Sequence, residues 1–494
     1  MTGLLLAAWL AASPTPLEEL QRHFDRHGRA TPRRDAALER AAASLADRSL
    51  DHPAAEISAQ ASVSAAVSAA GGWDPAPRAL VFRARPASAA LEALRQSVSA
   101  ADEPASHAGA AMAQSGTLGS VVVLLAERLA ELEPFPRTLP GPVSSHPLCG
   151  RLLGELREPA LFVTGPDGAV VRRRARTSNG QFCVEVPLGR PGRHVVEIMA
   201  RSDARGPEVA ALFFADVAGA TAPPPEQAFV EPATDDAARD AIHARIGQLR
   251  AAHGAGALAR DAALERVAQA YAERMAAGHF FAHVSPDGDD MRKRLQAAGY
   301  AYISAGENLG CAPGVLAAHF GIEHSPGHRR NLLEPTHAVL GVGLAWEEDP
   351  DGGRRAVLVE LLARPAREVK DPTAEAWAAV AARRRGAGLP PLERSELLEQ
   401  MARDHARRML AANTPAARLP RARPLTERIF EATDLHSAAV DILVADDPAQ
   451  LAQAAHVLDA AARVAGVGVT RGDSPTRGRG RYWMVLLSAE PRRK

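Results

Sequence analysis

One seven-residue segment occurs twice in this chain, and this repeat restricts the architecture more than any other feature. The segment RDAALER stands at 34–40 and again at 260–266, each time shortly after a His-Gly pair. A third stretch, at 388–409, shares the glycine and the spacing of the apolar residues. These apolar residues recur every three or four positions, which predicts an amphipathic helix in each of three copies.

The three copies also share a pattern further along the chain. The runs GAAM, GVGL and GVGV are each followed by a turn and then by an apolar run, SVVVLLA, AVLVELLA or YWMVLL. This pattern is typical of two strands joined by a hairpin. A helix and a hairpin in every copy predict an α+β fold of homologous modules, which we place near residues 15–135, 236–365 and 372–494.

The segment at 145–220 has a different character. Its short apolar runs have the length and the turn signals of strands, and Asn179-Gly180 is a typical hairpin turn. We therefore expect a small antiparallel β-sandwich in this part of the chain. Pro-rich stretches at 134–142 and 218–232 are expected to be the linkers on either side of it.

The start of the chain and its cysteines bear on its location. Residues 3–12, GLLLAAWLAA, have the length of the apolar part of a signal peptide, so residues 1–13 would be removed. The alternative is that this run opens a buried helix. Cys149 and Cys183 would pair if an oxidising compartment brings them together, and the odd number of cysteines leaves at least one thiol unpaired. We expect a secreted or envelope-facing protein.

Composition argues against two kinds of partner. The chain has 58 Lys and Arg residues and 58 Asp and Glu residues, so its formal net charge is zero and it does not resemble a nucleic-acid binder. No later segment reaches about 18 uninterrupted apolar residues, so we expect no membrane-spanning helix.

Polar motifs concentrate in the middle module. The motifs HVSPDG, GENLG and HSPGHRRNLLEP all lie between 283 and 335. Ser-Pro pairs favour helix starts, because Ser caps a helix and Pro fits its first position. Ser285 would therefore start a helix that ends near Ala298. Ser325 would start a short helix with His328 in its first turn.

Together with the stretch RLQAAGY at 294–300, these motifs resemble the CAP superfamily of cysteine-rich secretory proteins, antigen 5 and pathogenesis-related 1, also called the SCP domain. The resemblance is to its bacterial branch and covers about residues 236–365. It implies an α-β-α sandwich whose cleft holds two histidines and, in many members, two glutamates. His283 and His328 match the two histidines, and Glu307 matches the Glu of the G-E-N motif.

The second glutamate of the family has no good counterpart here. Ile322 replaces the usual aromatic residue before S-P-G-H, and Glu323 is the nearest acid. His319 and Glu323 stand at helical spacing and are expected to form a surface pair. Arg329 is expected to be a solvated helix residue.

The matched residues are compatible with more than one kind of site. Two imidazoles and a carboxylate can hold a divalent ion such as zinc, so His283, His328 and Glu307 are candidate metal ligands. Without a metal they would form a hydrogen-bonded network that braces the cleft wall, and Asn308 would anchor the backbone there. Glu307 would be the general base if the module were a metal-dependent hydrolase or peptidase.

Three functions remain open on these grounds. The leading hypothesis is that the protein binds a lipid, glycan or peptide in the His/Glu cleft. This partner would be either a small ligand or a component of the cell envelope. The second is the hydrolase or peptidase. The third is a non-catalytic scaffold whose modules present surfaces to partners, because fold by itself does not imply function.

The outer modules lack the two histidines. The residues opposite them are Ala417 and Gln453 in the third copy and Ile57 and Gln96 in the first. In the first copy His52 would match only with a gap, and in the third copy Glu431 stands one place from the position of Glu307. A glutamine in place of an imidazole is a poor metal ligand. We therefore expect only the middle module to carry chemistry.

Overall fold

The structure is a computed structural model of the 494-residue chain. It describes residues 15–97, 105–178, 180–219, 230–348, 353–366, 369–474 and 476–492. The expected signal peptide at 1–13, Asn179 of the expected hairpin turn and most of the second expected linker lie outside these residues. The fold is α+β with several mixed sheets. Within the described part of the chain, no helix has the length and the apolar character that a membrane span requires.

The chain divides into two compact units. One unit contains the N-terminal module, the β-sheet segment that follows it and most of the middle module. The other contains residues 363–494 with the short segments 299–305 and 336–339.

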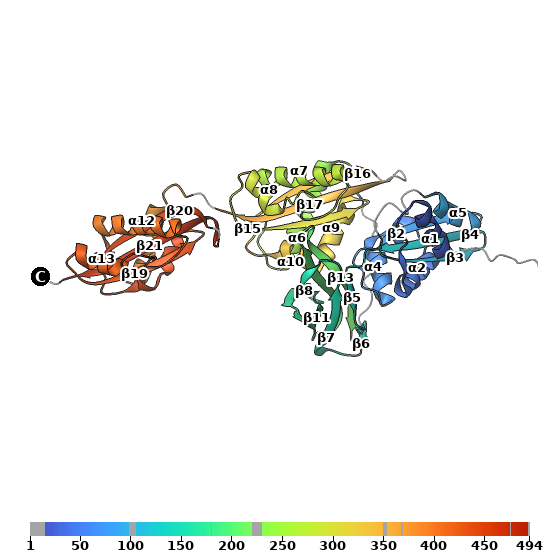
Figure 1. Ribbon diagram of the computed structural model, residues 1–494, viewed down its shortest axis with the longest axis horizontal. Helices are drawn as coiled ribbons and strands as arrows, with labels where there is room; N and C mark the ends of the chain where they lie inside the picture. Colours follow the sequence, from blue (N-terminus) through green and yellow to red (C-terminus); the bar gives the residue numbers. More distant parts are fainter. Residues whose placement is uncertain are drawn as a thin grey trace, which may run out of the picture. The chain divides into compact units, whose positions relative to one another are not determined.

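The N-terminal module is one sheet between helices (Figure 1). Its elements are α1 (Pro16–Arg26), β1 (Arg33–Arg34), α2 (Ala36–Arg48), α3 (Ala54–Ser58), α4 (Gln60–Ala69), β2 (Arg78–Ala84), α5 (Ser88–Gln96), β3 (His107–Ser115) and β4 (Leu118–Ala126). The strand order is β1-β3-β4-β2. Val121 and Val123 of β4 pack against α1 and α5, whereas Val122 and Leu124 pack against α2 and α4. Because successive side chains of a strand point to opposite faces of the sheet, this continuous apolar run supplies a core on each face.

Two further sheets follow and share one apolar core. Their strands are β5 (Ala130–Leu132), β6 (Thr138–Leu139), β7 (Val143–Leu152), β8 (Arg157–Thr164), β9 (Val170–Arg174), β10 (Arg176–Ser178), β11 (Gln181–Leu188), β12 (Gly192–Ser202) and β13 (Gly206–Val217). The orders are β10-β11-β7-β5 and β6-β13-β12-β8-β9. The expectation of a linker at 134–142 was wrong, because β6 pairs in parallel with the edge of β13 and buries Leu139 in the core. We call this segment the β-sandwich.

Cys149 and Cys183 form a disulfide between the paired strands β7 and β11. The bond closes a loop between residues that are 34 apart in sequence. Replacing both cysteines by serine is expected to lower the free energy of unfolding of the β-sandwich by about 2–4 kcal/mol, because the unfolded chain regains the entropy of the open loop. Hydrogen exchange of β-sandwich peptides in urea measures this. The variant Cys311→Ser is the control and should leave exchange in this segment unchanged; equal exchange in the double variant would contradict the prediction.

The middle module places its helices on both sides of a sheet of order β14-β16-β17-β15 (Figure 1). Its elements are α6 (Asp235–Ala252), β14 (Ala259–Arg260), α7 (Ala262–Gly278), α8 (Met291–Ala297), β15 (Tyr302–Ala312), α9 (Val315–His324), α10 (Pro326–Leu333), β16 (Val339–Glu348) and β17 (Arg354–Pro365). One core lies between the sheet and α6, α9 and α10. A Cβ on Gly343 of β16 would lie 2.1 Å from the carbonyl carbon of Ala268 in α7. The glycine therefore lets the backbone of α7 rest directly on the strand.

Both Ser-Pro pairs of this module precede a helix, but only one of them starts it. Ser325 is the N-cap residue of α10 and His328 lies in its first turn, which confirms that prediction. The prediction that Ser285 starts the other helix was wrong, because α8 begins later with Asp290 as its N-cap. The hydroxyl of Ser285 instead accepts a hydrogen bond from Asp289 N and closes a turn ahead of the helix.

The C-terminal module has a sheet of order β18-β20-β21-β19. Its elements are α11 (Pro372–Gly386), β18 (Glu393–Arg394), α12 (Glu396–Ala411), α13 (Leu425–Ala432), β19 (Leu435–Ala445), the 3-10 helices η2 (Pro448–Gln453) and η3 (Ala455–Leu458), β20 (Val464–Ser474) and β21 (Gly478–Pro491). Tyr482 and Met484 of β21 pack on the side of α11, whereas Trp483 and Val485 pack on the side of α12 and α13.

Candidate functional site

The structure brings His283, Glu307 and His328 together. His283 lies in the loop between α7 and α8, and its Nδ1 is 2.9 Å from Oε1 of Glu307 in the middle of β15. The ring of His328 lies 6.3 Å from that of His283, measured between centroids, at an interplanar angle of 26°. We call these three residues the His–Glu–His cluster.

Both carboxylate oxygens of Glu307 are engaged. Oε1 accepts from His283, and Oε2 accepts from Nη2 of Arg294 at 2.6 Å. The Glu307 side chain is only 3% exposed, and a buried carboxylate requires such partners. Because an ionised carboxylate only accepts hydrogen bonds, we assign the proton of His283 to Nδ1. In the neutral ring this tautomer leaves Nε2 as an acceptor.

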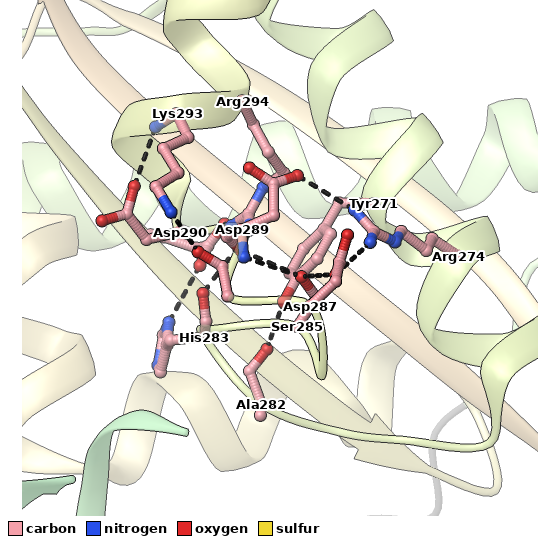
Figure 2. A network of polar contacts seen from close by, with 12 residues as sticks. Tyr271, Arg274, Ala282, His283, Ser285, Asp287, Asp289, Asp290, Lys293 and Arg294 are labelled. Carbon is pink, nitrogen blue, oxygen red and sulfur yellow. Dashed lines mark hydrogen bonds and ion pairs between the residues drawn. The ribbon is translucent and has the colours of Figure 1, made fainter. Parts of the chain in front are cut away.

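Arg294 is held over the ring of Tyr271, as Figure 2 shows. Its guanidinium carbon lies 3.3 Å from the ring centroid, and Nη1 donates to the carbonyl of Asp289 at 2.8 Å. The Tyr271 hydroxyl donates to the carbonyl of Ala282 at 2.6 Å. Burial raises the pKa of Tyr271 to about 12, so the phenol keeps its proton and remains a donor. Tyr271 thereby fixes the backbone next to His283.

His328 is oriented by a different chain of hydrogen bonds. Its Nδ1 lies 2.9 Å from Oγ of Ser325, and that hydroxyl donates to Oε2 of Glu197 at 2.5 Å. Burial, with a smaller contribution from the neighbouring His283, lowers the pKa of His328 to about 3, so the ring is neutral near neutral pH. Since the hydroxyl proton points to Glu197, Ser325 accepts from Nδ1–H of His328. The Nε2 of His328 is therefore also an unprotonated acceptor.

Glu197 was not among the residues that the sequence singled out. It lies on β12 of the β-sandwich and is fully buried. Its Oε1 accepts a hydrogen bond of 2.8 Å from the backbone N–H of Gly327. Burial raises the pKa of Glu197 to about 7, against the opposing effect of its two donors. The signal in the sequence is one acidic residue inside the apolar run HVVEIMA.

Two more contacts join the β-sandwich to this part of the middle module. The backbone N–H of Val284 donates to the carbonyl of Arg205, in the turn between β12 and β13, at 3.1 Å. Nε of Arg329 donates to the carbonyl of Gly168 at 3.0 Å. Arg329 is thus largely buried, and the expectation of a solvated residue was wrong because the β-sandwich supplies an acceptor for it.

Asn308 belongs to a neighbouring buried network. Its Nδ2 donates to Glu360 at 3.3 Å and its Oδ1 accepts from Asn331 at 3.0 Å, so it contacts side chains and does not anchor backbone as expected. Glu360 also lies 2.7 Å from Nδ1 of His319. His319 is fully buried, so its expected place at the surface beside Glu323 was wrong. The signal in the sequence is the same as for Glu197, because Glu360 is one acidic residue inside the apolar run AVLVELLA.

The arrangement offers two direct metal donors. Among the residues that the structure describes, no three His, Cys, Asp or Glu side chains converge as a metal-binding group. Glu307 is committed to His283 and Arg294, so it supports a ligand instead of being a third one. Two imidazoles that have Nδ1 held by an acceptor, and present Nε2 in their neutral forms, fit the donor chemistry of zinc, with water completing the coordination.

Comparison with family models identifies two of the modules. The model of the cysteine-rich secretory protein family, CAP, matches residues 243–359 and 377–487. Both segments are CAP domains. The resemblance seen in the motifs of the middle domain is therefore confirmed, and it extends to a C-terminal domain that lacks those motifs.

Several solved structures are similar to parts of the chain. An outer surface protein from Borrelia burgdorferi is 18% identical and covers 27% of this chain and 97% of its own, with a TM-score of 0.24. An extracellular SCP-domain protein from Bacillus anthracis is 19% identical and covers 47% and 88%, with a TM-score of 0.23. A cysteine-rich secretory protein from Staphylococcus aureus is 13% identical and covers 47% and 88%, with a TM-score of 0.21. Scores this low support no argument about function. No curated protein matches the chain.

Two internal contacts recur in both CAP domains and align them. In each, a side chain of the long helix bonds the backbone just before the first-histidine position, and a buried arginine near the end of the preceding helix bonds two carbonyls. In the middle domain, Tyr271 bonds the carbonyl of Ala282, and Arg250 bonds the carbonyls of Leu332 and Glu334. In the C-terminal domain, His405 bonds the carbonyl of Ala416, and Arg384 bonds the carbonyls of Val457 and Asp459. This alignment sets Ala417 opposite His283 and Gln453 opposite His328.

The position of Glu307 is also changed in the C-terminal CAP domain. The strands β15 and β19 both have 11 residues, and aligning their ends sets Val440 opposite Glu307. Glu431 lies on α13 and pairs with Arg423, so its expected place near the position of Glu307 was wrong. Counting back from the shared GVG run misplaces Glu431, because the chain between the end of β19 and Val457 is shorter than the chain between the end of β15 and Leu332.

Proposed function

We propose that the middle CAP domain binds a ligand at the His–Glu–His cluster, in a protein that works outside the cytoplasm. The disulfide between Cys149 and Cys183 supports this location, because disulfides persist in oxidising compartments. The ligand is an unidentified lipid, glycan or peptide. The domain's membership in the CAP family leaves that choice open.

A divalent cation, with zinc as the best fit, is part of this proposal. The observation that carries it is that His283 and His328 both have Nδ1 held by an acceptor and so both present Nε2. An ion there would supply a positive charge for an oxygen atom of the ligand. His283 and His328 would hold the ion, while Glu307 and Ser325 keep the two rings in the required tautomer.

A hollow of about 450 Å³ next to Arg294 offers space for a ligand. It is lined in part by Val267, Tyr271, Arg274 and Arg294. Its lining also includes Asp289, and Arg274 and Arg294 are paired with acids, so the apolar and aromatic surface is what suits the apolar part of a ligand. Because Arg294 bonds Glu307, a ligand in the hollow would contact the cation that holds the carboxylate partner of His283.

The state of Glu307 argues against the hydrolase alternative. A general base needs a carboxylate oxygen within reach of the proton that it removes. In this structure one oxygen accepts from His283 and the other from Arg294. Ligand binding is therefore favoured over hydrolysis with Glu307 as the base.

Zinc titration of the full chain tests the metal site. We expect the wild-type chain to bind one zinc ion and the variant His283→Ala/His328→Ala to bind it more than about 100-fold more weakly, because both direct donors are lost. Calorimetry and elemental analysis measure this. The control variant His27→Ala/His436→Ala removes two exposed histidines outside the middle domain and should bind like the wild type. Equal binding by the wild type and the His283/His328 variant would remove the metal from the proposal.

We also propose that the N-terminal module is a third, degenerate CAP copy that is kept as a surface and not for chemistry. Its sheet has the same strand order as those of the two CAP domains. Gly109, Gly341 and Gly466 occupy equivalent places, since a Cβ on each would lie within 2.4 Å of the backbone of the long helix. An experimental structure of the chain tests this by superposition. Helices that do not overlay with those of the middle domain would contradict it.

A further inference from the structure

We infer that Glu197 of the β-sandwich is a positioning residue of the His–Glu–His cluster, which acts through Ser325 to fix the tautomer of His328. The inference rests on the proposed function, because the tautomer matters to a ligand that uses Nε2 of His328. It assigns to the β-sandwich a part of the binding site of the middle CAP domain.

The hydrogen bonds run in one direction from His328 to Glu197. An ionised carboxylate has no proton to give, so Glu197 accepts from Ser325 at 2.5 Å and from the N–H of Gly327 at 2.8 Å. The single proton of the Ser325 hydroxyl is thus used, and its lone pair faces Nδ1 of His328 at 2.9 Å. Nδ1 must carry the proton, which leaves Nε2 as the donor atom for a ligand.

The two histidines of the cluster are therefore supported in parallel ways. His283 donates directly to Glu307, whereas His328 reaches its glutamate through one hydroxyl. Glu323, the acid that stands closest to Ser325 in the sequence, lies 3.6 Å from Arg329. The carboxylate that supports His328 comes from a different segment of the chain, 128 residues before Ser325.

The packing around Gly327 shows that Glu197 is closely seated. A Cβ on Gly327 would lie 2.1 Å from Sδ of Met199 and 2.7 Å from Oε1 of Glu197. Glu197 and Ser325 are both buried, so water does not compete readily for their hydrogen bond. A second point of contact holds the turn at Arg205 against Val284, next to His283. The β-sandwich is thus anchored to the middle domain both at Gly327 and at Val284.

The variant Glu197→Gln tests the role with almost no change in shape. An amide has one acceptor and one donor side, so it cannot accept from both Ser325 and Gly327. If its oxygen stays with Gly327, its NH₂ group donates to Ser325, and the hydroxyl then donates to Nδ1 of His328. The proton of His328 moves to Nε2, where it blocks the ligand.

The tautomer can be read in the metal-free full chain from the nitrogen chemical shifts of ¹⁵N-labelled histidines. The His328 signals are identified by their loss in His328→Ala. The measurement is made at pH 8, above the pKa of about 7 that burial gives Glu197, so that the carboxylate is ionised. We expect Nδ1–H in the wild type and Nε2–H in Glu197→Gln, with zinc affinity about 10- to 100-fold lower in the variant.

Two further variants keep the test decisive. Ser325→Ala removes the acceptor for Nδ1–H and should give the same tautomer change even if Glu197→Gln loosens the packing. Glu185→Gln is the matched control, because Glu185 also accepts from a serine of the β-sandwich, Ser145 at 2.6 Å, away from the cluster. An unchanged His328 tautomer in both Glu197→Gln and Ser325→Ala would overturn the inference. If the tautomer changes in both variants but the wild-type chain binds no zinc, the inference is upheld and the metal proposal alone is overturned.

Discussion

Gly343→Ala is expected to destabilise the middle CAP domain by about 3 kcal/mol or more, at the upper end of the cost of overpacking a core. The added Cβ would lie 2.1 Å from the carbonyl carbon and 2.3 Å from the carbonyl oxygen of Ala268. Both atoms belong to the backbone of α7, so no side-chain rotation relieves the clash. The whole helix must move away from β16, and its buried contacts with the sheet weaken.

Hydrogen exchange of peptides from α7, measured at increasing urea concentrations, reports the stability of the middle domain separately from that of the other domains. Gly247→Ala is the matched control, because Gly247 lies inside α6 with no atom within 4 Å of the added Cβ. Alanine is the better helix former by about 1 kcal/mol, so the control should be slightly stabilised. Wild-type exchange in the Gly343→Ala chain would show that the helix does not rest on the strand as described.

Arg294→Ala is expected to cost about 3–5 kcal/mol, because it leaves the buried carboxylate of Glu307 without its cation. The loss also removes the guanidinium from the face of Tyr271 and the hydrogen bond to the carbonyl of Asp289. Arg294→Lys should recover only part of the stability, since an ammonium lacks the planar fork that contacts several groups at once. Hydrogen exchange of peptides from β15 and α8 measures both variants.

Arg292→Ala on the same helix is the control. The Arg292 side chain is 71% exposed and lies 3.9 Å from Asp290, its acidic neighbour. Such a surface pair contributes little, so stability should change by less than about 0.5 kcal/mol. Similar losses for Arg292→Ala and Arg294→Ala would mean that the removal of any arginine from α8, and not the loss of the buried ion pair with Glu307, explains the effect.

The parts of the site that the sequence could predict are those decided by near neighbours. Ser325 occupies the N-cap position of α10, Pro326 follows it at the first helical position, and His328 lies in the first turn, because a helix start depends on residues within one turn. The same local reasoning failed at Ser285, where Asp290 competes as a cap a few residues later. Capping propensity alone does not predict whether Ser285 or Asp290 is the N-cap, because both can accept a hydrogen bond and both stand close to the start of α8.

The roles within the cluster depended on partners distant in sequence. The motifs singled out Glu307 as a candidate metal ligand or base, but Arg294 and His283 occupy both of its oxygens. His319 was expected at the surface beside Glu323, yet Glu360 on β17 gives it a buried acceptor. For both Glu307 and His319, the sequence singled out the residue, but its role depends on a side chain that is distant in the sequence and adjacent in the fold.

The sequence by itself determined the repeated helix-and-hairpin modules, the family of the middle domain and the identity of its two histidines, because these follow from periodicity and short motifs. The tertiary structure alone decided that Glu197 of the β-sandwich lies behind Ser325 and that Arg294 lies behind Glu307. The physical reason is that a hydrogen bond depends on separation in space. The partners Glu197 and Ser325 are 128 residues apart, and no local pattern records that distance.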